Sequence, residues 1–498
     1  MTKKNVKKIE YGDFQTPREL AHQVCILLKS QNCNPNSIIE PTCGVGRFFL
    51  EALNVFPKIK IGHAFDIDNE YIETLKSRLS KEKIPNQHTI EVANFFTKKW
   101  EAELNNLPEP TLIIGNPPWV TNSQLSQLQS NNLPTKYNIK KLKGLDALTG
   151  KSNFDISEWM INQMIEWLQK KQGTVAMLCK TSVARKVLMN AWKHNKKIDI
   201  ASMRIIDSKH HFNISADACL LTINSSNRPY KECKVYDNLS ASNPIQTIGF
   251  RDGFLVADIP SYEKTKHLID GDQHYKWRSG VKHDCSNVME VEKISEGLYL
   301  NGLGEKNELE DTYLFPLLKG SSVANGKIPK KFILVPQKKI GQETKHLAKT
   351  APKTWKYLLK YSDLLDKRAS SIYKNKPRFS VFGVGDYTFN SWKVAIPALY
   401  KKLEFSVIGP YQNKTVVFDD TVNFIALDNA EEAYELANLL NSKTANHFYR
   451  SFIFWDSKRP ITVQLLKSLD IDVLQSESGK ENNYSIRKRS SQLQLNYQ

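Results

Sequence analysis

Long apolar runs and a secretory leader are both missing from this 498-residue sequence. No stretch approaches the roughly 18 apolar residues that a membrane-spanning helix needs. The first ten residues, MTKKNVKKIE, are basic, but no apolar segment follows them, so they do not resemble a signal peptide. These absences speak against a membrane-bound or secreted protein. We expect a cytoplasmic protein without a membrane partner.

Paired cysteines and metal-binding motifs are also lacking. The seven cysteines are scattered and no CxxC pair occurs, which favours reduced thiols over a disulfide framework. No HExxH motif is present and the 11 histidines are dispersed, so we expect no metal site. No internal repeat is visible. What remains is a chain long enough for two or three globular domains.

Positive charge is abundant and unevenly distributed. The formal net charge is +18, and residues 321–410 hold 18 Lys and Arg against 5 Asp and Glu, so this segment alone carries +13. Such a surplus is typical of a polyanion partner, whereas the alternative is a merely soluble basic protein. Aromatic residues are interleaved with the basic ones, which favours a nucleic-acid surface. They include Trp355, Tyr357, Tyr361, Tyr373, Phe379, Phe382, Tyr387, Phe389, Trp392 and Tyr400.

The first ~225 residues alternate strand-like apolar runs with helical patterns, as in an α/β domain with a mostly parallel sheet. Helical stretches include residues 18–30, which follow Thr16-Pro17, and residues 71–83. The expected strands are SIIEP (37–41), IGHAFD (61–66), HTIEVANF (88–95), TLIIGN (111–116), TVAMLCK (174–180), ASMRIID (201–207) and ACLLTINS (218–225).

Composition divides the rest of the chain. Residues 121–153 are polar and read as a long mobile loop beside a site, or as an ordinary surface insertion. A linker is expected over 225–244, so that one domain covers 1–228 and a second, mixed α/β domain covers 245–475. The polar tail 476–498 is expected to be disordered.

A glycine loop follows the first expected strand. In IIEPTCGVGRFF the strand ends at Glu40, and Gly44 and Gly46 let the backbone approach a ligand at the carboxyl end of the sheet. Asp66 lies 22 residues after Gly44, the spacing of an acidic residue that binds ribose hydroxyls. The loop has neither GxGxxG nor a Lys-Ser/Thr for phosphates, so the ligand is a nucleoside without pyrophosphate. S-adenosylmethionine (SAM) fits, and its cationic amine suits the Glu40 carboxylate; a plain strand–helix turn is the alternative.

The next two strand ends carry polar residues as well. Asn94 could hydrogen-bond an adenine on which Phe95 stacks, or the pair could be a strand-end cap and a core phenylalanine. The fourth strand ends in Asn116-Pro117-Pro118-Trp119, where proline stops the sheet ladder. Four consecutive strand ends with such features are far more specific than any one of them.

Three motifs occur in one order: FQTP (14–17), EPTCGVG (40–46) and NPPW (116–119). With them the chain resembles the gamma-class DNA adenine-N6 methyltransferases of restriction–modification systems over roughly residues 10–225. The segments RSGVKHDCSNVME (278–290) and FWDSKRPIT (454–462) also look like those of related methyltransferases. Asn94 departs from the family, which usually has Asp at this position.

The resemblance implies a Rossmann-like SAM-dependent methyltransferase domain followed by a mixed α/β target recognition domain. It places the cofactor against Thr16, Glu40, Thr42, Gly44, Asp66, Asn94 and Phe95. The Asn116 side-chain oxygen and the Pro117 carbonyl, pre-aimed by the stiff Pro117-Pro118 turn, would accept the N6 hydrogens of an adenine flipped out of duplex DNA. Trp119 would stack on one face of that base and Phe212 on the other, although Phe212 could equally be a core residue.

Other substrates stay open at this stage. A protein amide, an RNA adenine and the N4 amine of cytosine could use the same acceptors, and a DNA-binding subunit with a decayed site is a different class. Cytosine-C5 methylation is disfavoured because no Pro-Cys pair occurs. We expect no fused nuclease before the Thr-Pro segment. The implied partners are double-stranded DNA and a restriction endonuclease that acts on the same site.

Overall fold

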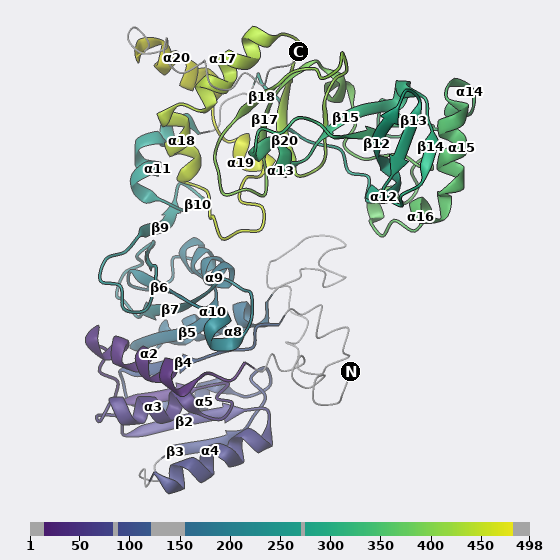
Figure 1. The fold of residues 1–498 in the computed structure, drawn as a ribbon. Helices are drawn as coiled ribbons and strands as arrows, with labels where there is room; N and C mark the ends of the chain where they lie inside the picture. Colours follow the sequence, from purple (N-terminus) through teal and green to yellow (C-terminus); the bar gives the residue numbers. More distant parts are fainter. Residues whose placement is uncertain (1–13, 83–87, 121–154, 270–273, 482–498) are drawn as a thin grey trace. The chain divides into compact units, whose positions relative to one another are not determined.

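The computed structural model describes residues 14–82, 88–120, 155–269 and 274–481 (Figure 1). The chain divides into two compact units, Met1–Ile259 and Pro260–Gln498. The loop expected over 121–153 lies outside the described residues. None of the described helices has the length and apolar character that crossing a membrane requires.

The first unit is built on one ten-stranded sheet of order β10-β9-β8-β6-β7-β5-β4-β1-β2-β3. From β3 to β5 the neighbours are parallel, and β7 then pairs antiparallel with both β5 and β6. The strands are β1 (Ser37–Glu40), β2 (Ile61–Asp66), β3 (His88–Val92), β4 (Thr111–Gly115), β5 (Gly173–Lys180), β6 (Ala201–Ile206), β7 (Ala218–Asn224), β8 (Glu232–Tyr236), β9 (Gln246–Arg251) and β10 (Phe254–Val256).

All seven expected strands are present, and the predicted α/β class is confirmed. The linker expected over 225–244 contains a strand of the sheet, β8. Residues 232–256 form β8, β9 and β10, which extend the same sheet through β6. Strand β8 is short and lies between polar turns, so its composition resembles a linker although Cys233 is buried. Strands β9 and β10 were expected in the second domain, which was predicted to begin at residue 245.

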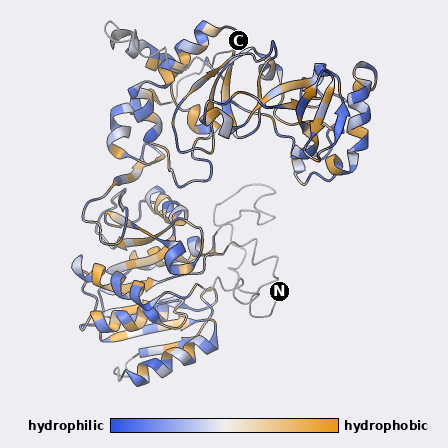
Figure 2. Ribbon diagram, viewed as in Figure 1, coloured by the Kyte–Doolittle hydropathy of each residue, from blue (hydrophilic) through white to orange (hydrophobic). Residues whose placement is uncertain are grey.

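Helices cover both faces of this sheet, which explains why its strands read as nearly continuous apolar runs (Figure 2). One core joins alternate strand residues to α2 (Arg18–Ser30), α3 (Arg47–Val55) and α4 (Asn69–Lys81). Successive strand side chains point to opposite faces. Ala64 belongs to that core, and its neighbour Phe65 points to the opposite face. There the Phe65 ring packs on Trp100 of α5 (Trp100–Asn105), with 5.3 Å between the ring centroids. The remaining helices are α8 (Ile156–Leu168), α9 (Thr181–Lys193) and the short α10 (Ser208–Phe212).

Helix starts follow local rules. The prediction of 18–30 for the first helix is confirmed, with Pro17 just before it. The helix expected over 71–83 begins earlier, at Asn69, because the Asp68 carboxylate caps it by accepting from Glu70 N at 2.8 Å.

The second unit contains two sheets, of order β11-β20-β17-β18 and β14-β13-β12-β16-β15-β19. Their strands are β11 (Arg278–Ser279), β12 (Glu290–Ser295), β13 (Leu298–Asn301), β14 (Lys306–Glu308), β15 (Leu314–Leu318), β16 (Lys331–Leu334), β17 (Trp392–Pro397), β18 (Ser406–Ile408), β19 (Val417–Phe418) and β20 (Val422–Leu427). The expected mixture of strands and helices is present.

Helices of this unit pack on both sheets. They are α11 (Ile259–Thr265), α12 (Ser286–Met289), α13 (Gly320–Ala324), α14 (Leu347–Thr350), α15 (Pro352–Lys360), α16 (Ser362–Asp366), α17 (Ala430–Leu440), α18 (Lys443–Arg450), α19 (Val463–Leu466) and α20 (Ile471–Glu481). Helix α20 continues past residue 476, where we expected a disordered tail to begin. Buried Ile471 and Leu474 anchor it, and residues 482–498 lie outside the described part of the chain.

Candidate active site

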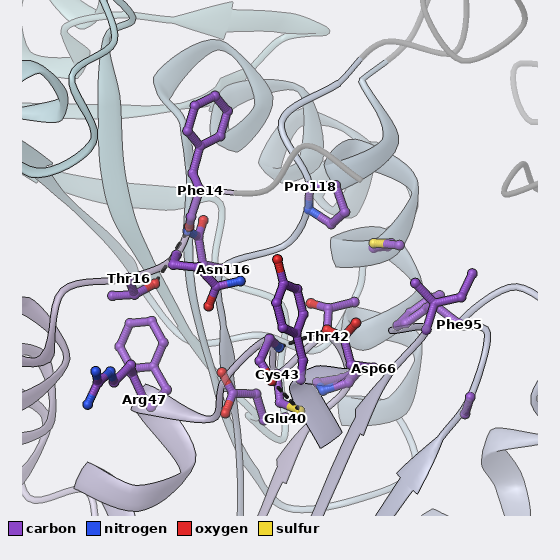
Figure 3. Close-up of a pocket in the computed structure, with 18 residues that line it drawn as sticks. Phe14, Thr16, Glu40, Thr42, Cys43, Arg47, Asp66, Phe95, Asn116 and Pro118 are labelled. Carbon is purple, nitrogen blue, oxygen red and sulfur yellow. Dashed lines mark hydrogen bonds between the residues drawn. The ribbon is translucent and has the colours of Figure 1, made fainter. Parts of the chain in front are cut away.

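A pocket lies at the carboxyl ends of β1, β2 and β4, on the side of the sheet where open α/β folds bind ligands (Figure 3). Eight of the twelve predicted site residues line it, namely Thr16, Glu40, Thr42, Gly44, Asp66, Phe95, Asn116 and Pro118. Pro117, Trp119, Phe212 and Asn94 are not among its lining residues.

The glycine loop is held by its neighbours. Gly44 and Gly46 both adopt left-handed conformations, with φ of 52° and 75°, which glycine tolerates best. The Gly44 amide donates to the Asp66 carboxylate at 2.7 Å, and the Val45 amide donates to Gln15 Oε1 at 3.2 Å. A Cβ on Gly44 would stand 2.7 Å from the same Gln15 oxygen. The FQTP segment, the loop and the end of β2 therefore form one rigid wall.

Glu40 is a buried carboxylate at the end of β1. Its exposed fraction is 2%, and Oε2 accepts from the Phe49 amide at 2.9 Å. Burial raises the pKa of Glu40 well above its usual range, the Phe49 amide opposes this shift, and the nearby Asp66 charge adds to it. None of the described lysines or arginines pairs with Glu40. A cationic ligand in the pocket would supply the missing partner, and the sulfonium and ammonium groups of SAM have that charge.

Asn116 presents a single free acceptor to the pocket. Its Nδ2 donates to the Phe14 carbonyl at 2.9 Å and to Thr16 Oγ1 at 3.4 Å, and these two acceptors assign the orientation of the amide. The Oδ1 atom is buried and has no hydrogen-bond partner. A buried unpaired oxygen costs free energy unless a donor arrives. The geometry therefore suits a substrate with an N–H group.

Trp119 is part of the hydrophobic core of the first unit, and the partly buried Phe212 packs against that core. The indole is 5% exposed, its Nε1 donates to the Leu178 carbonyl at 3.3 Å, and its ring centroid is 5.5 Å from that of Phe212 at an angle of 64°. Phe14 completes the cluster, 6.1 Å from Trp119 and 6.5 Å from Phe212. Two rings in edge contact leave no space for a base between them, because a sandwiched base needs parallel rings farther apart. Base stacking by these residues stays a prediction that requires a ring to move.

Asn94 and Phe95 lie beyond the end of β3. The Asn94 side-chain oxygen accepts from the Phe96 amide at 2.8 Å, as the strand-end alternative describes. Phe95 lines the pocket, but its ring also packs on two tryptophans. Its centroid lies 5.0 Å from that of Trp100 and 5.9 Å from that of Trp167, on which it stacks. Pro117 is buried in the turn.

Several lining residues were missed by the sequence analysis. Phe14, Gln15 and Ile67 adjoin the predicted Thr16 and Asp66, so adjacency to the motifs was the available signal. Tyr71 lies one helical turn farther along, in α4. Met160 reaches the pocket from α8, more than 40 residues after NPPW, and no sequence pattern connects it to the site.

The basic segment 321–410 is partly neutralised in the structure. Acidic partners include Glu308 for Lys353 at 2.7 Å and Glu305 for Lys360 at 2.6 Å. Lys393 is buried, with an exposed fraction of 1%. Other basic side chains of the segment are exposed and have no acidic partner among the described residues: Lys327, Lys330, Lys338, Lys345, Lys349, Lys356, Lys367, Lys374, Lys376 and Lys401. The described residues contain no group of three or more His, Cys, Asp or Glu placed to hold a metal ion.

Comparison with known proteins identifies the family. The family model for N-6 DNA methylases matches residues 2–197. The Type II methyltransferase M.NspV from Nostoc sp. (strain ATCC 29411 / PCC 7524) is 46% identical over 476 residues, which cover 94% of this chain and 97% of the relative. This chain belongs to the type II DNA adenine-N6 methyltransferases. A shorter match, 30% identity over 112 residues, covers 22% of this chain and 26% of the Type II methyltransferase M.VspI from Vibrio sp. (strain 343).

A solved structure has a similar fold. It is the Type IIL restriction-modification enzyme MmeI in complex with DNA, with a TM-score of 0.55 and 13% identity, and the match covers 94% of this chain and 67% of that one. The predicted family and the Rossmann-like methyltransferase fold are confirmed. The family and its relative support site-specific methylation of adenine in DNA within a restriction–modification system.

Proposed function

We propose that the pocket binds SAM and that Asn116 receives the N6 amine of an adenine flipped out of duplex DNA. The observation that carries the proposal is the buried, unpaired Oδ1 of Asn116 beside the buried, uncompensated Glu40. The first needs a hydrogen-bond donor and the second needs a cation. The two substrates of an adenine methyltransferase supply one each.

The pocket residues fit SAM from end to end. Glu40 would accept from the methionine ammonium, with Thr16 and Thr42 beside it, and Asp66 would accept from the ribose hydroxyls. Gly44 admits the ligand close to the backbone, while Phe95 offers a face to the adenine and Asn94 a polar edge. When bound, SAM supplies a methyl group on a sulfonium, which departs as a neutral thioether once the methyl is transferred.

Asn116 and Pro117 would activate the amine without forming a covalent bond. The lone pair of an adenine N6 is delocalised into the ring, which makes the amine a poor nucleophile. The Asn116 Oδ1 accepts one N6 hydrogen and the Pro117 carbonyl accepts the other, which draws the nitrogen toward sp³ geometry. Pro118 stiffens the turn, so the acceptors need no reorganisation when the reaction occurs. Orientation of this kind can supply about 7–11 kcal/mol of the barrier.

Duplex DNA is the proposed partner, because N6 is unreachable inside a stacked helix and must be extruded. The second unit would read the target sequence, and the similar fold of MmeI was solved in complex with DNA. Exposed lysines of 321–410 without acidic partners would grip phosphates, contacts that fix position rather than sequence. The biological role would be protection of host DNA from an endonuclease that acts on the same site.

The test is methyl transfer from radiolabelled SAM to unmethylated duplex DNA, with the product nucleosides separated and RNA and protein extracts in parallel. We expect label in N6-methyladenine from DNA with the wild-type protein and none with Asn116→Ala. Label in N4-methylcytosine would preserve the mechanism but change the base. Equal label with wild type and Asn116→Ala would remove Asn116 from the proposed role.

A further inference from the structure

Lys180 connects the NPPW turn to the start of α8. It is the last residue of β5, which runs parallel to β4 with Gly115 opposite Met177. The Lys180 ammonium lies 2.6 Å from Asp155 Oδ2 and 3.2 Å from the Trp119 carbonyl. The Lys180 side chain is 27% exposed and that of Asp155 is 7% exposed. One partly buried cation therefore holds a backbone acceptor and a buried carboxylate together.

Neighbouring contacts make this arrangement a fixed junction. The Ile156 amide donates to the Val120 carbonyl at 2.9 Å. Val120 follows Trp119 in the chain, and Ile156 follows Asp155, so this bond lies next to the two groups that Lys180 contacts. Asp155 also caps α8, because its Oδ1 accepts from the Ser157 amide at 3.2 Å and the Ser157 hydroxyl at 2.5 Å. The exit of the NPPW turn is thus attached to a helix end whose own geometry is determined by hydrogen bonds.

We infer that Lys180 is a positioning residue for methyl transfer, which rests on the proposed role of Asn116. The turn is held on one side where Asn116 Nδ2 meets the Phe14 carbonyl, and on the other side where Lys180 meets the Trp119 carbonyl. Two prolines between these anchors restrict rotation, so a shift at Trp119 is transmitted to the Pro117 carbonyl. Lys180 acts through the turn and keeps both acceptors aimed at the amine.

The experiment compares Lys180→Met with Lys180→Arg and with a matched control. Lys186→Met is the control because Lys186, in α9, pairs with Glu158 of α8 at 3.4 Å, so the variant removes a lysine–carboxylate pair to the same helix, α8, away from the turn. The readouts are kcat, KM for a target duplex, the Kd of SAM and the melting temperature. An acceptor displaced by about 1 Å costs about 10²-fold in rate. We therefore expect Lys180→Met to lose about 10- to 100-fold in kcat, with KM and Kd within about twofold.

Two further variants separate position from charge. Lys180→Arg keeps a cation that can bridge both acceptors, and we expect most of the rate to return. Lys180→Met alone leaves the Asp155 carboxylate unpaired, which is destabilising by itself. The double variant Lys180→Met/Asp155→Asn removes that charge and keeps the helix cap, so it should recover melting temperature but not kcat.

Three results would overturn the inference. They are a kcat for Lys180→Met equal to that of Lys186→Met, a loss of SAM affinity that parallels the loss of rate, and recovery of kcat in the double variant. Asn116→Ala is run alongside. An inert Asn116→Ala with a fully active Lys180→Met would reject only the role of Lys180, whereas an active Asn116→Ala would reject the proposed chemistry itself.

Discussion

The Asn116 side-chain amide donates to the Phe14 carbonyl at 2.9 Å, although the two residues are 102 positions apart. This one bond decides which end of the amide faces the pocket. Because the NH₂ group is used by Phe14 and Thr16, the oxygen is left as the acceptor. The FQTP segment thereby orients the residue that the chemistry requires.

Replacing Asn116 should separate catalysis from cofactor binding. We expect Asn116→Ala to reduce kcat by at least about 10²-fold, comparable to the loss of one preorganised hydrogen-bonding group in other active sites, with the Kd of SAM unchanged. Asn116→Asp keeps an acceptor but places a carboxylate against the Phe14 carbonyl. Its rate should therefore lie between the rates of the wild type and of Asn116→Ala. Single-turnover kinetics and calorimetric SAM titrations measure both effects. Loss of SAM binding in Asn116→Ala would move this residue out of the catalytic role.

Glu40→Gln should have opposite effects on stability and on cofactor binding. Burial raises the pKa of Glu40, so the native state binds more protons than the unfolded state above the ordinary carboxyl pKa. The free energy of unfolding then falls as pH rises through that window. The uncharged variant should melt higher than wild type at pH 7–8 without SAM, yet bind SAM about 10- to 100-fold more weakly, since a hydrogen bond to a charge is lost. Unchanged SAM affinity would contradict the assignment of Glu40.

Trp119→Ala should lose less activity on a target with a mismatched adenine than on a paired one, because extrusion then costs less. The indole is buried, so its removal also costs about 3–5 kcal/mol of stability, and rates must be compared well below the melting temperature. Trp119→Phe is the control: it retains an aromatic ring, and it loses the Nε1 bond to the Leu178 carbonyl and part of the buried ring volume. Equal losses on both targets would reject stacking by Trp119.

DNA affinity should depend steeply on salt through lysines that lack acidic partners. Lys374 and Lys376 are exposed and unpaired among the described residues, whereas Lys353 and Lys360 are paired with Glu308 and Glu305. If the first two contact phosphates, the double variant Lys374→Ala/Lys376→Ala should reduce the slope of log K against log salt by about 2, or about 1 per contact. Lys353→Ala/Lys360→Ala, measured by the same fluorescence titrations, should change the slope less. Identical slopes would place the DNA contact elsewhere.

Lys393 gives the second unit a pH-dependent stability. Its ammonium donates to the carbonyls of Asn390 and Val416, both at 2.8 Å, and burial lowers its pKa to about 7. The pKa of a lysine in an unfolded chain is about 10.4. Between about pH 7 and 10 the unfolded state therefore binds more protons than the native state. Stability should therefore rise with pH across this window, by at most about 1.4 kcal/mol per unit. Denaturant titrations of Lys393→Met should lack this rise; a slope parallel to that of the wild type would contradict the burial argument.

The parts of this protein that depend on local pattern were predictable. Strand ends 40, 66 and 116 follow from apolar periodicity, and parallel strands bring them to one edge. The contacts that decide the details are long-range. Neither the use of the Asn116 NH₂ group by Phe14 nor the covering of Trp119 by Phe212 leaves a trace in sequence spacing. Strand β8 was assigned to a linker because a short strand between polar turns shares its composition.

The bond between the Ile156 amide and the Val120 carbonyl, 2.9 Å long, has a consequence for engineering. The described backbone ends one stretch at Val120 and begins the next at Asp155, and the hydrogen bond brings Val120 and Ile156 side by side. Closing such a short gap costs little chain entropy. A turn of a few residues that connects Val120 to Asp155 should therefore leave the sheet intact. This junction is a suitable site for exchanging segments between related enzymes.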